Sequence, residues 1–203
     1  MKRMGLPALK NDRIYTYSDY RLWPEDERWE LINGTAWNMS PAPSRYHQEY
    51  CGELFFQIAN YLKSCKVPCR VYSAPFDVLL PDEPDQDEDD IRTVVQPDIS
   101  VICSREKLTE KGCTGAPDWI IEILSPYTSR KDMVVKHALY EKHGVREYWV
   151  VDGGNKYVHV YLLGEERKYP KVPEIYVDDT RVYSTVIKGL SVDLSAVFKE
   201  SAV

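Results

Sequence analysis

The sequence has no long apolar run and no sign of a secretory leader. No stretch approaches the roughly 18 consecutive apolar residues of a membrane-spanning helix. The opening MKRMGLPALKNDR has basic residues but lacks the apolar core of a signal peptide. We therefore predict a cytoplasmic protein with no membrane partner. Internal repeats and low-complexity linkers are absent too, and 203 residues suit a single domain, 1–203, with a sizeable core.

Basic charge is also scarce. The formal net charge is -6, because the segment 81–90, PDEPDQDEDD, holds seven of the 32 acidic residues; the rest of the chain is close to neutral, with 26 Lys and Arg. A strongly basic surface is the usual electrostatic signature of a nucleic-acid-binding protein, and the composition does not provide one. It does not exclude a nuclease, since a local basic face is enough to attract DNA.

Cysteine is sparse and irregularly spaced. The five residues are Cys51, Cys65, Cys69, Cys103 and Cys113. Cys65 and Cys69 form the one close pair, and no second Cys or His pair follows at a distance typical of a zinc site. Because thiols stay reduced in the cytoplasm, we predict ordinary thiols and no structural zinc.

The N-terminal third predicts a β-hairpin followed by a helix. Residues 14–43 alternate aromatic and polar side chains, and Asn33-Gly34 forms a turn signal because both positions tolerate positive φ. Residues 45–65 change to helical spacing, with Pro43-Ser44 as the start. The apolar positions of this helix are Cys51, Leu54, Phe55, Ile58, Tyr61, Leu62 and Cys65.

The rest of the chain alternates strands with one more helix. A helix is predicted over 129–144, with Ser129 and Asp132 in a capping box and Gly144 at the C-terminal cap. Pro126 ends the strand before it. Strands are predicted at 70–80, 94–103 and 118–125, and 145–163 is predicted as two strands joined by a Gly153-Gly154 turn. A loop or short helix is predicted over 104–116, with further strands such as 181–187 in a C-terminal β extension, 153–195.

This order predicts an α/β (α+β) domain in which helices flank a mixed β-sheet. The run WIIEIL is apolar on both faces, which is typical of a strand in a sheet that is covered on both sides. The core would span about 45–152, between the N-terminal β-hairpin and the C-terminal β extension.

Glu122 is the one charged residue in that apolar run, WIIEILSP. A buried carboxylate is costly unless something pairs with it. Asp98 lies near the start of the preceding strand, and if the two strands are neighbours, alternation brings both acids to one side of the sheet. Two close carboxylates repel unless a cation lies between them, and Mg²⁺ suits such a pair because it takes oxygen ligands.

Lys136 lies on the helix that follows the Glu122 strand. Asp132, Lys136 and Tyr140 are spaced four apart and share one stripe of that helix, so Lys136 can reach back over the strand end and orient a water or offset negative charge. Each residue also has a structural interpretation: Glu122 in an internal ion pair, Asp98 at a turn, Asp132 as a cap and Lys136 on the surface. Together they favour a site.

The segments QPDISVI and PDWIIEILSPYTSRKDMVVKHALYEKHGVREYWVVD, with WELINGTAWNMSPAPSRYH nearer the N-terminus, resemble the Uma-type (Uma-two) family of candidate restriction endonucleases, within the PD-(D/E)XK nuclease superfamily. The resemblance covers roughly residues 14–195. It implies a restriction-endonuclease-like core in which Asp98 and Glu122 bind Mg²⁺ or Mn²⁺, with the carbonyl of Ile123 as a further ligand. The superfamily places a lysine two residues after the second acid, where this sequence has Leu124. The resemblance implies that Lys136 takes that role, with Lys131 as a rival.

Three further residues could belong to the site. Glu30 and Asp77 could add carboxylates near the metal, although we interpret Glu30 more readily as an exposed hairpin residue. His47 falls at helical spacing with the apolar positions, which favours a hydrogen-bonded core histidine over a catalytic one.

These observations favour a metal-dependent endonuclease acting on DNA. The alternatives are an inactive nuclease-like binding or assembly module, in which Glu122 would be tied to a protein cation, and a hydrolase of another phosphoester. The strand-rich segment 157–190 offers apolar surface for a homodimer.

Overall fold

The computed structural model describes residues 13–24, 26–39, 42–125 and 131–199. Its largest sheet has six strands in the order β11-β10-β9-β8-β6-β3. β8 and β9 are parallel, and their neighbours in this sheet pair antiparallel. The strands are β3 (Arg70–Ser73), β6 (Ile99–Ile102), β8 (Trp119–Ile123), β9 (Glu147–Asp152), β10 (Tyr157–Leu162) and β11 (Glu174–Val177).

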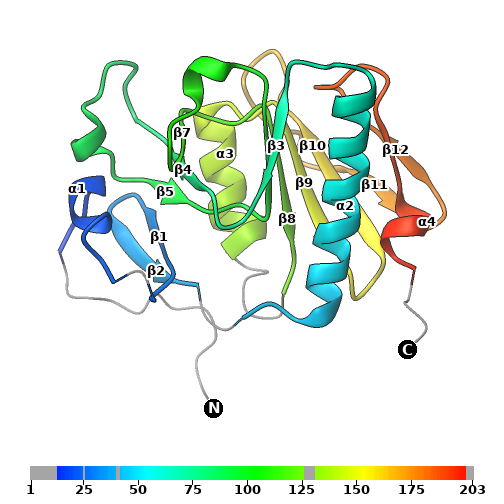
Figure 1. The fold of residues 1–203 in the computed structure, drawn as a ribbon, viewed down its shortest axis with the longest axis horizontal. Coiled ribbons are helices and arrows are strands. Elements are labelled where there is room, and N and C mark those ends of the chain that lie inside the picture. The colour runs from blue at the N-terminus through cyan, green and yellow to red at the C-terminus, as the bar shows by residue number, and fades with distance from the viewer. Residues whose placement is uncertain (1–12, 25, 40–41, 126–130, 200–203) are drawn as a thin grey trace.

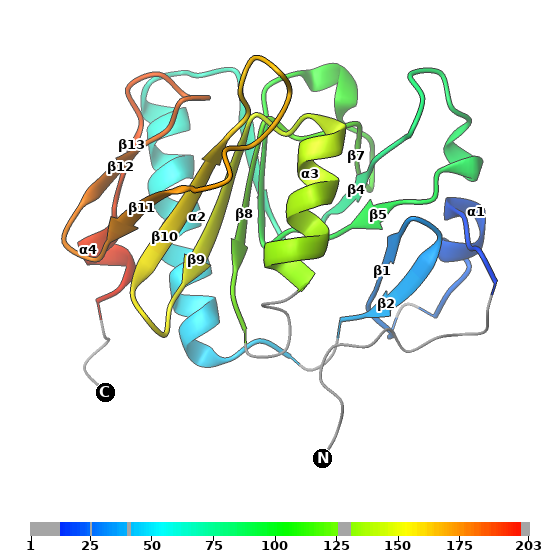
Figure 2. The same cartoon turned by 180° about the vertical axis from the view of Figure 1, so that it is seen from behind.

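Helices cover both faces of this sheet, as the two opposite views show (Figures 1 and 2). The helix α2 (Arg45–Ser64) packs against the face that carries Trp119, Ile121 and Ile123 of β8. The helix α3 (His137–His143) packs against the other face, where Ile120 lies. The alternation of β8 therefore buries apolar side chains on both sides, and the mixed sheet with flanking helices that the sequence predicts is confirmed.

Local signals set the ends of these helices. The Ser44 hydroxyl accepts a hydrogen bond from the amide of His47 at 3.2 Å, which caps α2. Gly144 ends α3 with φ of 81°, a left-handed conformation that glycine adopts without strain. The predicted capping box at Ser129 and the strand end at Pro126 lie outside the described residues.

A second sheet has five strands in the order β2-β1-β5-β4-β7. Its hairpin turns at Asn33 and Gly34, whose φ values are 50° and 78°, so the predicted turn is confirmed. The strands are β1 (Trp29–Ile32), β2 (Thr35–Asn38), β4 (Asp77–Leu79), β5 (Val94–Val95) and β7 (Gly112–Thr114). β7 lies where the sequence predicts a loop or short helix.

Two of the predicted strands, 70–80 and 94–103, are wrong as single strands. Each is divided between the two sheets: 70–80 into β3 and β4, and 94–103 into β5 and β6. Pro75 and Pro97 lie at the breaks, where a residue without an N–H cannot continue the ladder. The chain thus crosses from one sheet to the other twice, at neighbouring places.

Smaller elements complete the fold. The C-terminal extension packs its apolar side chains into the core on the α2 face. No helix of the described residues is long and apolar enough to cross a membrane. The smaller elements are α1 (Tyr17–Tyr20), η1 (Glu88–Asp90), η2 (Arg105–Lys107), the π-helix η3 (Lys131–Lys136), β12 (Arg181–Tyr183), β13 (Ser191–Asp193) and α4 (Leu194–Val197).

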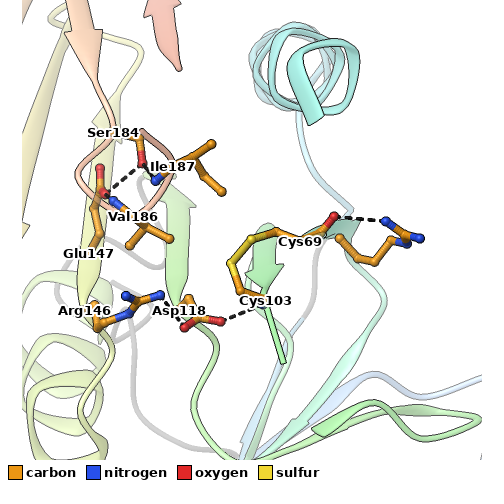
Figure 3. Close-up of a disulfide and its surroundings, with 9 residues drawn as sticks. Cys69, Cys103, Asp118, Arg146, Glu147, Ser184, Val186 and Ile187 are labelled. Atoms are coloured by element: carbon orange, nitrogen blue, oxygen red, sulfur yellow. Dashed lines mark hydrogen bonds and ion pairs between the residues drawn. A yellow bond between two sulfur atoms is a disulfide. The ribbon is translucent and has the colours of Figure 1, made fainter. Parts of the chain in front are cut away.

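Cys69 and Cys103 form a disulfide, so the prediction of ordinary thiols is wrong for this pair (Figure 3). The reason is strand register: β3 pairs with β6 so that Arg70 faces Ile102, which brings the two flanking cysteines together across a separation of 34 residues. Cys51, Cys65 and Cys113 are free thiols. Disulfides are uncommon in reducing compartments, and the cytoplasmic location stays a prediction.

Glu147 anchors the C-terminal extension to the sheet. Its side chain is fully buried at the start of β9. Oε2 accepts hydrogen bonds of 3.0 Å from Ser184 Oγ and Val186 N (Figure 3). It also accepts bonds of 2.9 and 3.0 Å from Thr185 N and Oγ1, and Oε1 accepts one of 2.8 Å from Trp149 Nε1. Five donors together replace the hydration that this carboxylate loses on burial.

Glu147→Ala is expected to lower the free energy of unfolding by about 2–4 kcal/mol, because it leaves several buried donors without an acceptor. Urea unfolding measures this, and limited proteolysis should cut the chain near 184–187 sooner. The matched control is Glu165→Ala at an exposed loop position, where the change should stay within about 0.5 kcal/mol. Equal stability of the two variants would contradict the anchoring role.

Candidate active site

A cavity of about 280 Å³ lies where the chain crosses between the two sheets. Ser73 and Ala74 line it at one crossing, and Gln96 and Asp98 line it at the other. The other acidic and basic residues that line it come from the residue before β1, from α2, from the end of β8 and from η3: Arg28, His47, Glu122, Lys131, Asp132 and Lys136. The cavity therefore gathers residues from both sheets and from both helical layers.

Asp98 lies on this cavity, immediately before β6. β6 and β8 are antiparallel neighbours with Ile99 opposite Ile121, so the convergence of Asp98 and Glu122 that strand alternation predicts does occur. Asp98 Oδ2 accepts a hydrogen bond from the amide of Ile123 at 2.8 Å. This bond fixes the carboxylate beside the end of β8 while its side chain stays 21% exposed to the cavity.

Glu122 is nearly fully buried, with 3% of its surface exposed. Its Oε1 accepts hydrogen bonds of 2.7 Å from both Lys136 Nζ and the Tyr140 hydroxyl. Burial, followed by the charges of Asp132 and Asp98, raises the pKa of Glu122 to about 8, against the opposing effect of Lys136. A further cation next to this carboxylate would favour its charged form.

Lys136 is the centre of a buried ion cluster. Its Nζ lies 2.7 Å from Glu122 Oε1, 2.8 Å from Glu30 Oε1 and 3.7 Å from Asp132 Oδ1. Burial alone would lower the pKa of Lys136, but Glu122, Glu30 and Asp132 raise it well above its usual value. The ammonium therefore stays charged and balances the carboxylates around it.

Glu30 is fully buried, so the interpretation of it as an exposed hairpin residue is wrong. It accepts from Lys131 Nζ at 2.6 Å and from the amide of Gln96 at 2.9 Å, in addition to its contact with Lys136. Burial would raise the pKa of Glu30, but Lys136 and Lys131 lower it to about 2. The pairing of β1 with β5 carries this side chain inward toward the cavity.

The π-helix η3 explains why two lysines meet one glutamate. In an α-helix, positions five apart point about 140° away from each other around the axis. The i→i+5 hydrogen bonding of a π-helix returns such positions to nearly the same side. Lys131 and Lys136 are the first and last residues of η3, and both contact Glu30.

His47 and Asp77 take different places. His47 Nε2 lies 3.2 Å from Asp98 Oδ2 on the cavity wall; burial lowers its pKa, but the hydrogen bond and charge of Asp98 raise it to a net value above normal. Asp77 does not join Asp98 and Glu122. It lines a second cavity and accepts hydrogen bonds from Tyr20 and Gln96.

The family model Uma2, described as "Putative restriction endonuclease", matches residues 17–195. The chain belongs to the Uma2 family. A similar solved structure, described as "a putative nuclease belonging to DUF820" from Anabaena variabilis ATCC 29413, is 24% identical, with a TM-score of 0.69 over 90% of this chain and 97% of that one. That likeness shows the shared fold. No curated protein matches.

The donor set of this Uma2-family protein fits Mg²⁺ or Mn²⁺ as a two-carboxylate site. Within the described residues, no group of three or more His, Cys, Asp or Glu side chains is arranged to hold a metal. Mg²⁺ commonly uses one or two carboxylates and fills its other positions with water and substrate phosphate. The hydrogen bonds of Glu122 go to Oε1 and those of Asp98 to Oδ2, which leaves one oxygen of each for such an ion.

Two features of this Uma2 site had no clear signal in the sequence, the burial of Glu30 and the role of Gln96. The burial of Glu30 depends on pairing between β1 and β5, segments about 60 residues apart. Gln96 donates its amide to Glu30 and its side chain to Asp77, and only its place before Pro97-Asp98 could have drawn attention to it. Tyr140 shares the stripe of Asp132 and Lys136, and its hydroxyl contacts Glu122.

Proposed function

We propose that this protein is a metal-dependent endonuclease that hydrolyses phosphodiester bonds in DNA. The observation that supports this most is the Ile123 amide bond to Asp98, which holds one carboxylate on an open cavity beside a second, buried one, Glu122. Membership in the Uma2 family supports the same reading. Asp98, Glu122 and the carbonyl of Ile123 would hold Mg²⁺ or Mn²⁺.

The side chains around this pair have separate tasks in the proposal. When bound, the metal would polarise the scissile phosphate and lower the pKa of a water molecule. Lys136, fixed on Glu122, would orient that water or offset charge on the phosphate in the transition state. Lys131 is the rival for this role, since its side chain is 10% exposed against 3% for Lys136. His47 and Tyr140 orient Asp98 and Glu122.

Incubation of the purified chain with DNA tests the proposal. Supercoiled, linear duplex and single-stranded DNA should be cut with Mg²⁺ or Mn²⁺ and should stay intact in EDTA, because the carboxylates alone cannot activate water. Electrophoresis of the products measures this. Intact DNA in all forms across Mg²⁺, Mn²⁺, Co²⁺ and Zn²⁺ would count against the proposal.

One observation favours the alternative of a nuclease-like binding or assembly module. That reading expects Glu122 to be tied to a protein cation, and Lys136 occupies such a position. Calorimetry of Mn²⁺ binding separates the two, because the enzyme should bind Mn²⁺ and Glu122→Gln should weaken binding on the order of tenfold or more. No heat of Mn²⁺ binding for either the wild type or Glu122→Gln would favour the binding module. Hydrolysis of another phosphoester would share the site, and small phosphodiesters in the cleavage assay test it.

A homodimer remains a proposal as well. β11 is an edge strand of the six-stranded sheet, and its side chains Ile175 and Val177 are 58% and 48% exposed. An exposed apolar edge can pair with a second copy, which light scattering of the purified chain would detect.

A further inference from the structure

A second cavity, of about 340 Å³, adjoins the candidate active site. Arg28 and Gln96 line both cavities, so the two are direct neighbours. Four aromatic rings and two prolines form its apolar wall, and we call it the aromatic cavity. Its apolar lining residues are Tyr17, Tyr20, Trp23, Pro24, Trp29 and Pro75. The volume lies within the range of small-molecule sites, about 300–1,000 Å³.

The rings of the aromatic cavity form a connected wall. The ring centroids of Trp23 lie 5.4 Å from those of Tyr20 and 5.8 Å from those of Trp29, at interplanar angles of 56° and 68°. Tyr20 and Trp23 are only partly buried, at the edge of an apolar cluster. Partly exposed aromatic faces around a hollow suit a flat, aromatic ligand, because stacking uses the face of each ring.

Polar groups lie at the junction of the aromatic cavity with the active site. Gln96 Nε2 donates to Asp77 Oδ1 at 2.8 Å and to the Tyr20 hydroxyl at 3.2 Å, while Arg28 donates to Gln96 Oε1 at 2.9 Å. Amide, carboxylate and hydroxyl groups can hydrogen-bond the edge of a base. Arg21, Arg28 and Lys111 line the cavity beside Glu27 and Asp77, and Arg21 is paired with Asp89.

We propose that the aromatic cavity holds the base of an unpaired nucleotide in the DNA substrate, next to the phosphate that is hydrolysed. This inference rests on the proposed nuclease function. A base inside a duplex presents only its edges in the grooves, so its face reaches an aromatic wall only in a single strand or after it leaves the stack. The substrate class is therefore DNA with unpaired bases: single strands, flaps or mismatched sites.

The charge of the protein supports the same conclusion. Neutralisation of many phosphates by basic residues drives most duplex binding, and this chain, at net charge -6, has little basic charge to spare. Base stacking on aromatic side chains is a source of affinity that does not need that charge.

Binding in EDTA tests the inference without any cleavage. A fluorescent single strand should bind the full chain about tenfold or more tighter than the same sequence as a duplex, by anisotropy. Trp23→Ala should weaken single-strand binding about 5- to 100-fold, and Trp23→Phe should stay within about threefold, because it keeps an aromatic face. The matched control is Tyr183→Ala, an aromatic residue 66% exposed on β12, which should leave binding unchanged.

A second measurement needs no variant, so it holds even where Trp23→Ala does not fold. Titration of the wild-type chain with oligothymidylate should quench its tryptophan fluorescence, and duplex DNA at equal concentration should not. Equal affinity for single and double strands, without quenching, would overturn the inference. Cleavage of DNA together with that result would leave the proposed function intact. Quenching and Trp23-dependent binding without cleavage would support the inference and overturn the nuclease.

Discussion

Asp98→Asn is expected to slow DNA hydrolysis by a factor on the order of 10³ at saturating Mg²⁺. The substitution keeps the shape of the side chain, and Asn Oδ1 can still accept the hydrogen bond from the Ile123 amide that now ends at Oδ2 of Asp98 at 2.8 Å. What it removes is one negative charge beside Glu122, and a hard divalent cation depends on that charge. Initial cleavage rates over a range of Mg²⁺ concentrations measure the effect.

Asp118→Asn provides a closely matched control. Asp118 also lies just before a strand of the six-stranded sheet, and its Oδ2 accepts a hydrogen bond from the amide of Cys103 at 2.7 Å. Its other oxygen contacts Arg146 at 2.6 Å (Figure 3), and it does not line the candidate active site. The same chemical change at this position should leave the cleavage rate within about threefold of wild type.

A loss of activity shared by both variants would mean that Asp98 has only a structural role. Thermal melts show how much stability each substitution costs. Both substitutions remove a carboxylate that accepts a hydrogen bond from a backbone amide, so both should shift the melting temperature by similar amounts. Cleavage by Asp98→Asn within tenfold of wild type would contradict the assignment of Asp98 to the metal.

Lys136→Met is expected to lower the free energy of unfolding by about 3–5 kcal/mol. The variant fills a similar volume but leaves Glu30 and Glu122 buried with less positive charge, and the burial cost of these carboxylates is then uncompensated. The loss of unfolding free energy in Lys136→Met should be larger at pH 8 than at pH 6. Without Lys136 the pKa of buried Glu122 rises further above its unfolded value, so the folded state binds more protons and loses stability as pH increases.

Lys131→Met tests whether the position of the charge matters. Lys131 contacts Glu30 alone among the carboxylates around Lys136, and its side chain reaches the cavity. We expect a smaller loss of stability, about 1–2 kcal/mol, because Lys136 still pairs with Glu30. Urea unfolding of both variants at the two pH values measures this. Equal, small losses for both lysines would contradict a buried cluster centred on Lys136.

The superfamily has a catalytic lysine at the position that Leu124 occupies here, and cleavage by these two variants tests whether Lys131 or Lys136 takes its role. If Lys131→Met folds stably and loses cleavage, Lys131 meets the substrate and Lys136 orients Glu122. If it folds and cleaves, the role stays with Lys136.

The sequence predicted those parts of the site that depend on local pattern. Alternation within 94–103 and 118–125 assigned Asp98 and Glu122 to one face, and helical spacing assigned Lys136 and Tyr140 to one stripe. The first expectation depends only on the two strands being neighbours. The second depends on a helix between β8 and β9, and parallel strands need a crossover connection of this kind. The cap at Gly144 and the turn at Asn33-Gly34 follow from glycine and asparagine in left-handed backbone.

The parts that local pattern could not predict depend on contacts between distant segments. Pro75 and Pro97 mark the breaks within 70–80 and 94–103, but neither run indicates that its two halves join different sheets. The disulfide depends on the register of β3 against β6, and the burial of Glu30 depends on the pairing of β1 with β5. Both arise from tertiary packing, which overrides what short segments prefer.

The ion cluster also links the two sheets, since Glu30 comes from β1 in one sheet, Glu122 from β8 in the other, and both lysines from η3 between them. The two lysines offset the buried carboxylates only while all are present, so losing one lysine alone leaves buried negative charge without its partner. In evolution these positions should therefore change together: an alignment of relatives should show Glu30, Glu122, Lys131 and Lys136 as covarying positions, although the two acids are 92 positions apart.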